Sequence, residues 1–280
     1  MHRVRSRDGT AIAFDRTGGG PALIMVDGAL CSRAIGPGKT LAAPLSESFT
    51  VFTYDRRGRG DSSDSVPYTV EREIEDLEAL IREAGGSAYV FGHSSGAALA
   101  LEAAARGSSI TKLALYEAPF IVDNSRAPIP DDIVERFNKL LAADRRGDAV
   151  RLFMRQVGVP RIATAVMRFL PIWSKLEAVA HTLPYDQAIV AGRQTGKPLP
   201  AERWTAVTMP SLVLVGEKSP AWFQNGTRAL ARALPNARLG VADRQTHGIK
   251  AKLVAPQLAD FFAAAESEPG SQVAAAASDV

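Results

Sequence analysis

The residues best suited to chemistry lie in the segment 92–96, whose sequence is GHSSG. A short apolar run precedes it at 88–91, and an alanine-rich stretch follows it at 97–106. This order predicts a buried strand, a very tight turn and a helix. In that setting the pattern G-x-S-x-G is typical of a nucleophile elbow, a strained turn that lifts a serine hydroxyl above a sheet. We therefore predict that Ser94 is a nucleophile. The alternative, a chance Gly/Ser turn, does not explain the strand before it and the helix after it.

The neighbours of Ser94 fit this interpretation. Gly92 and Gly96 flank the turn, where any Cβ would collide with the adjacent strand and helix. Ser94 also lies at the expected N-terminus of a helix, where free N–H groups and the helix dipole favour developing negative charge. Such a position suits a reaction that passes through an oxyanion.

A serine nucleophile needs a base, and histidine is the usual one near neutral pH. The chain has four histidines: His2, His93, His181 and His247. His2 is at the start of the chain and His93 is inside the turn itself. His247 follows the last predicted strand, and it is the candidate base. The alternative is a solvated loop histidine.

Composition narrows the class of protein. The 280 residues are 46% hydrophobic and 22% charged, which is ordinary for one globular α/β domain with an insertion. A net charge of +3 gives no reason to expect nucleic acid as a partner, and no apolar run is long enough to span a membrane. Cys31 is the single cysteine, so no internal disulfide can form. The first residues lack the apolar region of a signal peptide, and we expect a cytoplasmic protein.

Strand and helix patterns alternate along the chain. Strands are predicted at 4–6, 12–15, 22–26, 49–54, 88–91, 112–116, 211–215 and 237–241, and helices at 40–46, 70–84, 97–106, 227–234 and 251–265. This alternation predicts a mostly parallel sheet with helices on both faces.

The interval from 119 to 208 breaks the alternation. It holds helical patterns at 131–144, 148–156, 162–170 and 173–182, separated by prolines. We expect a core formed by 1–119 and 209–266, a helical cap inserted at 120–208, and a disordered tail at 267–280, which is rich in Ala, Ser and Glu.

Four motifs carry a resemblance to a known family. They are Asp27-Gly28 after the third strand, the segment YDRRGRGDS at 54–62, the turn around Ser94, and His247 followed by Pro256 in a terminal helix. Together they resemble the α/β-hydrolase fold, and the chain looks like a cap-bearing serine hydrolase of an uncharacterised bacterial group. The segment 54–62 resembles the family turn D-x-R-G-x-G-x-S, which has a mainly structural role. The resemblance implies that the backbone N–H groups of Ser95 and Ala29 form the oxyanion hole, and that the late histidine is the base.

The family usually has a third catalytic residue, an acid that binds the histidine, and at this position the chain differs from the family. After strand 211–215 the family usually has Gly-x-x-Asp, whereas this chain has Gly216-Glu217-Lys218-Ser219. Serine carries no negative charge to stabilise an imidazolium. Glu117 directly follows strand 112–116, and this resembles the relocated glutamate of some haloalkane dehalogenases. We predict Glu117 as the acid. Weaker candidates are Glu217 and Asp123, a dyad without an acid remains open, and the alternative for Glu117 is a bond to a backbone amide.

Two further features have structural alternatives. Asp27 replaces the family's histidine before Gly28, and we expect its carboxylate to accept loop N–H bonds. The three tryptophans, Trp173, Trp204 and Trp222, are candidates for a substrate pocket, although tryptophans usually serve packing.

These observations predict a serine hydrolase that cleaves a small or medium apolar carboxylic ester, or a related acyl compound, through an acyl-enzyme at Ser94. Its partner is a small-molecule substrate. No cofactor or metal is implied, and nothing indicates an oligomeric state. Epoxide hydrolases and dehalogenases of this fold need an aspartate at the nucleophile position. Two alternatives remain: a lyase or cyclase that uses Ser94 and His247 as acid and base, and a ligand-binding protein on a weakened hydrolase site.

Overall fold

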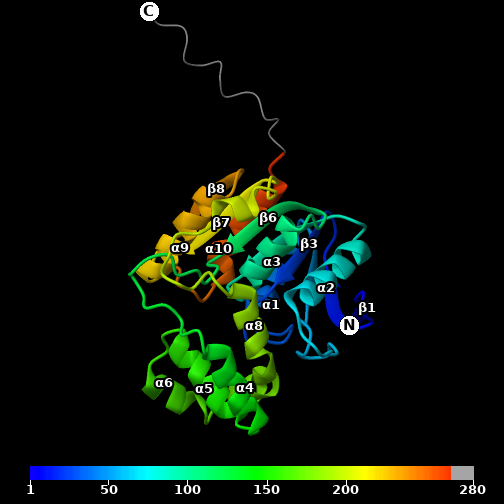
Figure 1. Cartoon of the computed structure of the whole chain (residues 1–280). Helices are drawn as coiled ribbons and strands as arrows, with labels where there is room; N and C mark the ends of the chain where they lie inside the picture. The colour runs from blue at the N-terminus through cyan, green and yellow to red at the C-terminus, as the bar shows by residue number, and fades with distance from the viewer. Residues whose placement is uncertain (266–280) are drawn as a thin grey trace, which may run out of the picture.

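An eight-stranded sheet forms the centre of the molecule (Figure 1). The structure is a computed structural model that describes residues 1–265. The strand order is β1-β2-β4-β3-β5-β6-β7-β8. The strands are β1 His2–Arg5, β2 Ala11–Thr17, β3 Ala22–Val26, β4 Thr50–Tyr54, β5 Ala88–His93, β6 Ile110–Tyr116, β7 Ser211–Gly216 and β8 Ala237–Ala242. β2 runs antiparallel to β1 and β4, and the other neighbours are parallel. The predicted α/β-hydrolase fold, with a mostly parallel sheet, is confirmed.

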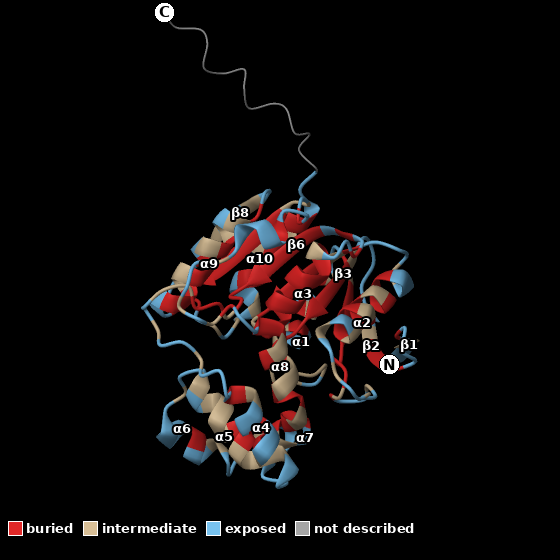
Figure 2. Ribbon diagram, in the orientation of Figure 1, coloured by how far each residue is buried: buried red, intermediate tan, exposed pale blue. Residues whose placement is uncertain are grey.

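Helices cover both faces of this sheet. They are α1 Pro37–Leu45, α2 Val70–Glu83, α3 Ser95–Ala105, α9 Ala221–Ala233 and α10 Ala251–Ala263. One apolar cluster joins α2, α3 and α9 to one face, and a second joins α1 and α10 to the other. Figure 2 shows the central strands and α3 as the most deeply buried part of the chain. In such a sheet the carboxyl ends of the parallel strands share one edge, where the site residues are expected.

A group of helices lies between β6 and β7. It comprises α4 Ile133–Ala142, α5 Arg146–Gln156, α6 Arg161–Met167, α7 Ile172–Val179, the 3-10 turn Ala180–Thr182, α8 Leu183–Val190 and the 3-10 turn Ala201–Trp204. We call residues 120–208 the insertion. Its helices pack around Phe137 and Leu183, and this cluster also takes in Leu30 from the loop after β3. Figure 1 shows α4, α5 and α6 set apart from the sheet, with α8 between them and the core.

Two helices differ from the sequence prediction. α8 was not predicted, because Pro184 was interpreted as a break between helices. Proline is compatible with the first turn of a helix, where its missing N–H would have no partner, and Pro184 occupies that turn. α9 begins at Ala221 rather than 227, and Pro220 occupies its N-cap position. The predicted tail at 267–280 lies outside the described residues.

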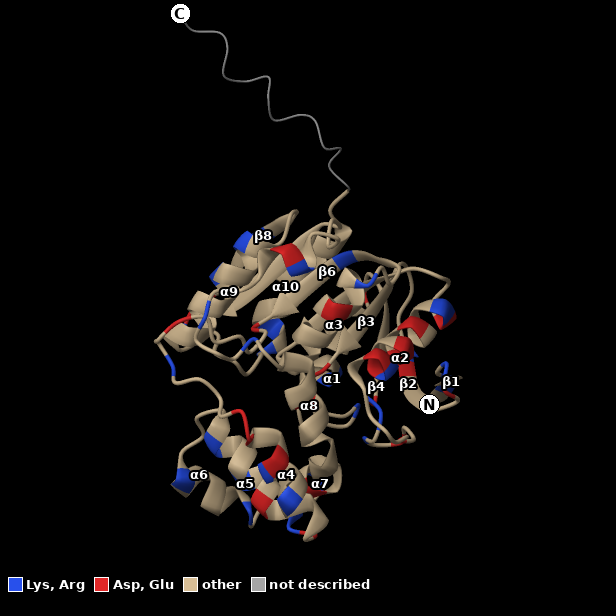
Figure 3. Cartoon of the chain, viewed as in Figure 1, with Lys and Arg blue, Asp and Glu red and all other residues tan. Residues whose placement is uncertain are grey.

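Basic and acidic residues are interspersed on both the core and the insertion (Figure 3). Among residues 1–265, no helix combines the length and the apolar character needed to cross a bilayer.

Candidate active site

Ser94 lies at the turn between β5 and α3, in a backbone conformation that residues other than glycine rarely adopt. Its φ is 57° and its ψ is −125°. The flanking glycines make this turn possible. A Cβ on Gly92 would lie 2.5 Å from Cα of Ala97, and one on Gly96 would lie 2.1 Å from the carbonyl oxygen of Val26. The strained backbone presents a half-buried hydroxyl at the end of β5, as expected for a nucleophile elbow.

The loop after β3 lies directly against this serine. A Cβ on Gly28 would come within 2.9 Å of Cβ of Ser94, so only glycine fits there without displacement. The loop therefore brings the backbone of Ala29 close to Ser94. Within residues 1–265, neither the N–H of Ala29 nor that of Ser95 donates a hydrogen bond. Both N–H groups remain available to an oxyanion.

His247 is paired with Glu117. Nδ1 of His247 lies 2.7 Å from Oε2 of Glu117, which is completely buried. The other carboxylate oxygen, Oε1, accepts hydrogen bonds from N–H of Gly216 at 2.8 Å and from Oγ of Ser219 at 2.5 Å. Glu117 therefore binds the backbone amide that was its alternative partner and the imidazole as well. A carboxylate in this position orients the ring and stabilises the imidazolium form.

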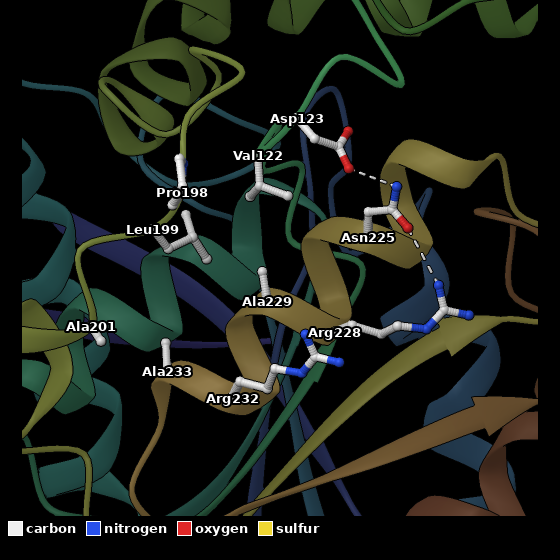
Figure 4. A pocket seen from close by; sticks show the side chains of 10 residues that line it. All are labelled: Val122, Asp123, Pro198, Leu199, Ala201, Asn225, Arg228, Ala229, Arg232 and Ala233. Carbon is white, nitrogen blue, oxygen red and sulfur yellow. Dashed lines mark hydrogen bonds between the residues drawn. The ribbon is translucent and has the colours of Figure 1, made fainter.

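The weaker candidate acids bind other groups. Oε2 of Glu217 accepts a hydrogen bond from N–H of Arg244 at 2.7 Å. Oδ2 of Asp123 accepts one from Nδ2 of Asn225 at 2.7 Å. Figure 4 shows this pair at the wall of a hollow of about 610 Å³ beside α9. The hollow is lined by Val122, Asp123, Pro198, Leu199, Ala201, Asn225, Arg228, Ala229, Arg232 and Ala233, which include neither Ser94 nor His247.

Three groups hold the loop that carries His247. Oη of Tyr116 donates to the carbonyl oxygen of Thr246 at 2.7 Å, and Nε2 of His93 contacts the carbonyl oxygen of His247 at 3.0 Å. The ring of Phe223 stacks on that of His247, with centroids 4.4 Å apart and 14° between planes. Burial, assisted by the charge of His247, lowers the pKa of His93 to about 3. His93 is therefore neutral, and its contact with the carbonyl oxygen supports the backbone of His247.

Asp27 is the first residue of the loop after β3, and its side chain is buried. Oδ1 accepts a hydrogen bond from N–H of Gly38 at 2.9 Å, which is the kind of loop contact that we expected. Burial raises the pKa of Asp27 to about 7. Burial, together with the charge of Asp27, also raises the pKa of the Cys31 thiol to about 12. Cys31 is thus a protonated packing residue at neutral pH.

The three tryptophans have different environments. Trp204 is completely buried and stacks on Phe120, so it packs the core and offers no surface to a substrate. Trp173 belongs to the apolar cluster of the insertion. Trp222 stacks on Phe223 at 3.6 Å between centroids, which leaves it one ring away from His247.

Sequence reasoning missed two residues near the site, Phe223 and Asp186. Phe223 lies in the first turn of α9, which was predicted to begin later. Asp186 lies on α8, which was not predicted, and is 1% exposed between Arg56 and Arg59. A helix that begins at Leu183, with Pro184 in its first turn, would have been the signal for Asp186, because it turns that carboxylate towards the core.

Comparison with known proteins places this architecture in a family. A model described as "Alpha/beta hydrolase family" matches residues 32–264. The chain belongs to the alpha/beta hydrolase family. A crystal structure of an alpha/beta hydrolase from Sphaerobacter thermophilus DSM 20745 is 51% identical, with a TM-score of 0.87, and the match covers 93% of this chain and 100% of that one.

More distant structures share the fold. The enol-lactonase from Burkholderia xenovorans LB400 is 22% identical with a TM-score of 0.67, over 93% of this chain and 99% of that one. The esterase EaEST from Exiguobacterium antarcticum is 18% identical with a TM-score of 0.70, over 94% and 99%. The uncharacterized hydrolase YraK of Bacillus subtilis (strain 168) is 28% identical over 156 residues, which are 52% of this chain and 55% of YraK. The match thus spans about half the length of that curated relative. At these identities the two structures show a shared fold.

Proposed function

We propose that this hydrolase is a serine esterase that cleaves small or medium apolar carboxylic esters, or related acyl compounds, through an acyl-enzyme at Ser94. The observation that carries the proposal is the 2.7 Å contact between His247 and the buried Glu117, together with the strained backbone of Ser94. The enol-lactonase and esterase among the similar folds act on ester bonds by their names, which agrees with this class.

Each residue has one role in the proposed reaction. The imidazole of His247 removes the proton from Oγ of Ser94 as Oγ attacks the carbonyl carbon. The N–H groups of Ala29 and Ser95 bind the oxyanion, and Glu117 stabilises the protonated ring. When the tetrahedral intermediate collapses, the bond to the leaving alcohol breaks and the alcohol oxygen takes the proton from His247.

Water completes the cycle. His247 deprotonates a water molecule, which attacks the acyl carbon. The second tetrahedral intermediate then collapses, the bond from the acyl carbon to Oγ of Ser94 breaks, and Oγ takes the proton back from His247 as the acid is released. In this proposal the insertion acts as a cap that encloses the acyl group. Neither step requires a cofactor.

Covalent labelling tests the proposal. A fluorophosphonate should add its mass to Ser94 in the native protein, and Ser94→Ala should remain unmodified while keeping its circular dichroism spectrum. Acetate release from p-nitrophenyl acetate should be present in the native protein and lost in the variant. A folded native protein that is neither labelled nor active would refute the esterase and favour the ligand-binding alternative. Labelling without hydrolysis of any ester would favour the lyase or cyclase.

A further inference from the structure

We propose that a buried ion network formed by Arg56, Arg59 and Asp186 positions both N–H donors of the oxyanion hole. Asp186 comes from α8 of the insertion, whereas the two arginines follow β4 in the core. The insertion would then take part in catalysis through the core's own backbone, as well as by covering the site. This inference rests on the proposed function, because it assigns positioning residues to the same reaction.

Asp186 joins the two arginines, and Arg56 also donates to both carboxylate oxygens of the buried Glu73. Oδ1 of Asp186 accepts from Nη1 of Arg56 at 2.8 Å, and Oδ2 accepts from Nη2 of Arg59 at 2.8 Å. All three side chains are at most 2% exposed. Burial alone would raise the pKa of Asp186, but Arg59, Arg56 and the hydroxyl of Ser95 hold it below its usual value. The carboxylate is therefore charged and fixed by both of its oxygens.

Arg59 controls the first donor. Its Nη1 donates to the carbonyl oxygen of Gly28 at 2.7 Å. That carbonyl and the N–H of Ala29 belong to the same planar peptide, in which they point in opposite directions. Fixing the direction of the Gly28 oxygen therefore fixes the direction of the Ala29 N–H. Without Arg59 this peptide could rotate, because the loop's other bond to the same oxygen is a long contact of 3.4 Å from N–H of Cys31.

Arg56 and Asp186 control the second donor. Oγ of Ser95 donates to Oδ1 of Asp186 at 2.7 Å and lies 3.3 Å from Nη1 of Arg56. Ser95 is the first residue of α3, so this anchor sets where its backbone N–H lies relative to Ser94. The same Nη1 atom donates to the carbonyl oxygen of Asp27 at 3.3 Å, which connects the loop after β3 to the same guanidinium.

A second ion pair on the same turn provides a matched control. Arg57 donates to both carboxylate oxygens of Asp76 at 2.7 Å, and both side chains are completely buried. The other bonds of Arg57 go to Asp8, Ser65 and the carbonyl oxygen of Arg72. Among the described residues, Arg57 therefore has no hydrogen bond to the loop after β3 or to Ser95. Losing this pair should affect the fold without displacing an oxyanion donor.

The decisive experiment compares Asp186→Asn with Asp76→Asn. Each substitution keeps the shape of the side chain and removes one buried charge that pairs with arginine. Steady-state kinetics on p-nitrophenyl acetate should show kcat lowered by about 10- to 100-fold in Asp186→Asn, with KM within about threefold, since losing one oxyanion donor outright costs about 100- to 1000-fold. In Asp76→Asn, kcat should stay within about threefold of the native value, even if the melting temperature falls as much as it does in Asp186→Asn.

Binding of a transition-state analogue separates positioning from general damage. A trifluoromethyl ketone adds to Ser94 and places an oxyanion in the hole, whereas the matching methyl ketone does so poorly. Asp186→Asn should weaken the trifluoromethyl ketone by the same factor as kcat and leave the methyl ketone within about threefold. Ser95→Ala removes one anchor without stranding a charge, so it supplies a folded variant in any case, and its kcat should fall by several-fold.

Failure of the inference is distinguishable from failure of the proposed function. Labelling of Ser94 by the phosphonate also develops charge on an oxygen in the hole, so its rate measures the donors without an ester substrate. A native protein that neither labels nor hydrolyses refutes the proposed function and the inference with it. An active native protein whose Asp186→Asn and Ser95→Ala variants keep kcat and labelling rate, or lose no more than Asp76→Asn, refutes the inference alone.

Discussion

Ser219 donates a hydrogen bond to Glu117 across the ends of two neighbouring strands, with 2.5 Å between Oγ and Oε1. β6 and β7 pair in parallel, and Glu117 follows one while Ser219 lies in the loop after the other. The position where the family usually has its aspartate therefore supplies a donor, and the neighbouring strand supplies the carboxylate. In the proposed mechanism the two residues divide between them what one aspartate does elsewhere: Glu117 would hold the charge, and Ser219 would fix its orientation.

Replacing the carboxylate should cost far more than replacing its donor. Glu117→Gln keeps the size of the side chain but removes the charge that stabilises the imidazolium. We expect kcat to fall by about 100-fold or more, because loss of a triad acid can cost about ten-thousandfold. Ser219→Ala should lower kcat by less than about tenfold. Glu217→Gln serves as the control and should match the native enzyme. Near-native turnover in Glu117→Gln, measured by initial rates on p-nitrophenyl acetate, would point to a dyad.

Asp27 should make the protein less stable as the pH rises. Its pKa in the fold is about 7, against 3.8 for an ordinary aspartate. Between these values the unfolded chain releases the proton while the folded chain retains it, so the free energy of unfolding falls by up to about 1.4 kcal/mol per pH unit. Above the folded pKa this loss is complete, and below the unfolded pKa it is absent.

Asp27→Asn removes this titration and keeps an oxygen for the N–H of Gly38. Urea unfolding at pH 5 and pH 8 should show a variant that gains stability relative to the native protein on going to the higher pH. Asp123→Asn, at a half-buried carboxylate whose pKa is lowered by hydrogen bonds from Ser125, is the comparison with no such gain. An Asp27→Asn variant that runs parallel to the native protein at both pH values would show that the buried carboxylate is not costly.

Phe223 should contribute to turnover through the orientation of His247. The two rings are stacked at 4.4 Å, and Trp222 covers the other side of Phe223. Removing the ring in Phe223→Ala would free the imidazole to rotate and admit water beside it, and we expect kcat to fall by about tenfold. Trp222→Ala, one ring further away, should lower kcat by less. Equal losses in both variants, or a change confined to KM, would contradict an orienting role.

The parts of the fold that sequence could predict are those with strong local signals. The strand before Ser94, the glycines around it and the apolar runs of the sheet each follow from sterics or periodicity within a few residues. The pairing of Glu117 with His247 was predicted because Glu117 directly follows a strand, at a place that resembles the relocated glutamate of some haloalkane dehalogenases. By contrast, α8 was missed because Pro184 can either break a helix or start one, and local sequence does not distinguish the two. Asp186 was missed with it, since its arginine partners lie more than a hundred positions away in the chain.

The aromatic candidates show the same limit. A tryptophan's type predicts burial, but it does not predict whether the ring faces a core or a cavity. Trp204 packs on Phe120, while Trp222 lies next to the ring that covers His247. The position of Trp222 follows from the start of α9 at Ala221, directly after Pro220 at the N-cap position.

The contact between the loop after β3 and the insertion should limit the length of the acyl chain. Ala29, whose N–H is a proposed oxyanion donor, packs against the cluster that contains Leu30, Phe137 and Trp173. Leu30 is only 5% exposed, so the loop and the insertion are in close contact there. An acyl group bound beside Ala29 would meet this packed surface, and extending the chain would require displacing it. Across a series of p-nitrophenyl esters, we therefore expect kcat/KM to rise through short chains and then to fall.

Shortening one side chain of this contact should shift the optimum. Leu30→Ala opens space between the loop and the insertion, and we expect the preferred ester to be longer by a few carbons than that of the native enzyme, with a lower melting temperature because a packed contact is lost. Leu258→Ala, in the apolar cluster on the α10 face of the sheet, removes a similar volume and should destabilise the protein without moving the optimum. A native enzyme whose kcat/KM keeps rising into long chains would contradict the enclosed site. An unchanged optimum in Leu30→Ala would show that the limit to chain length lies elsewhere in the protein.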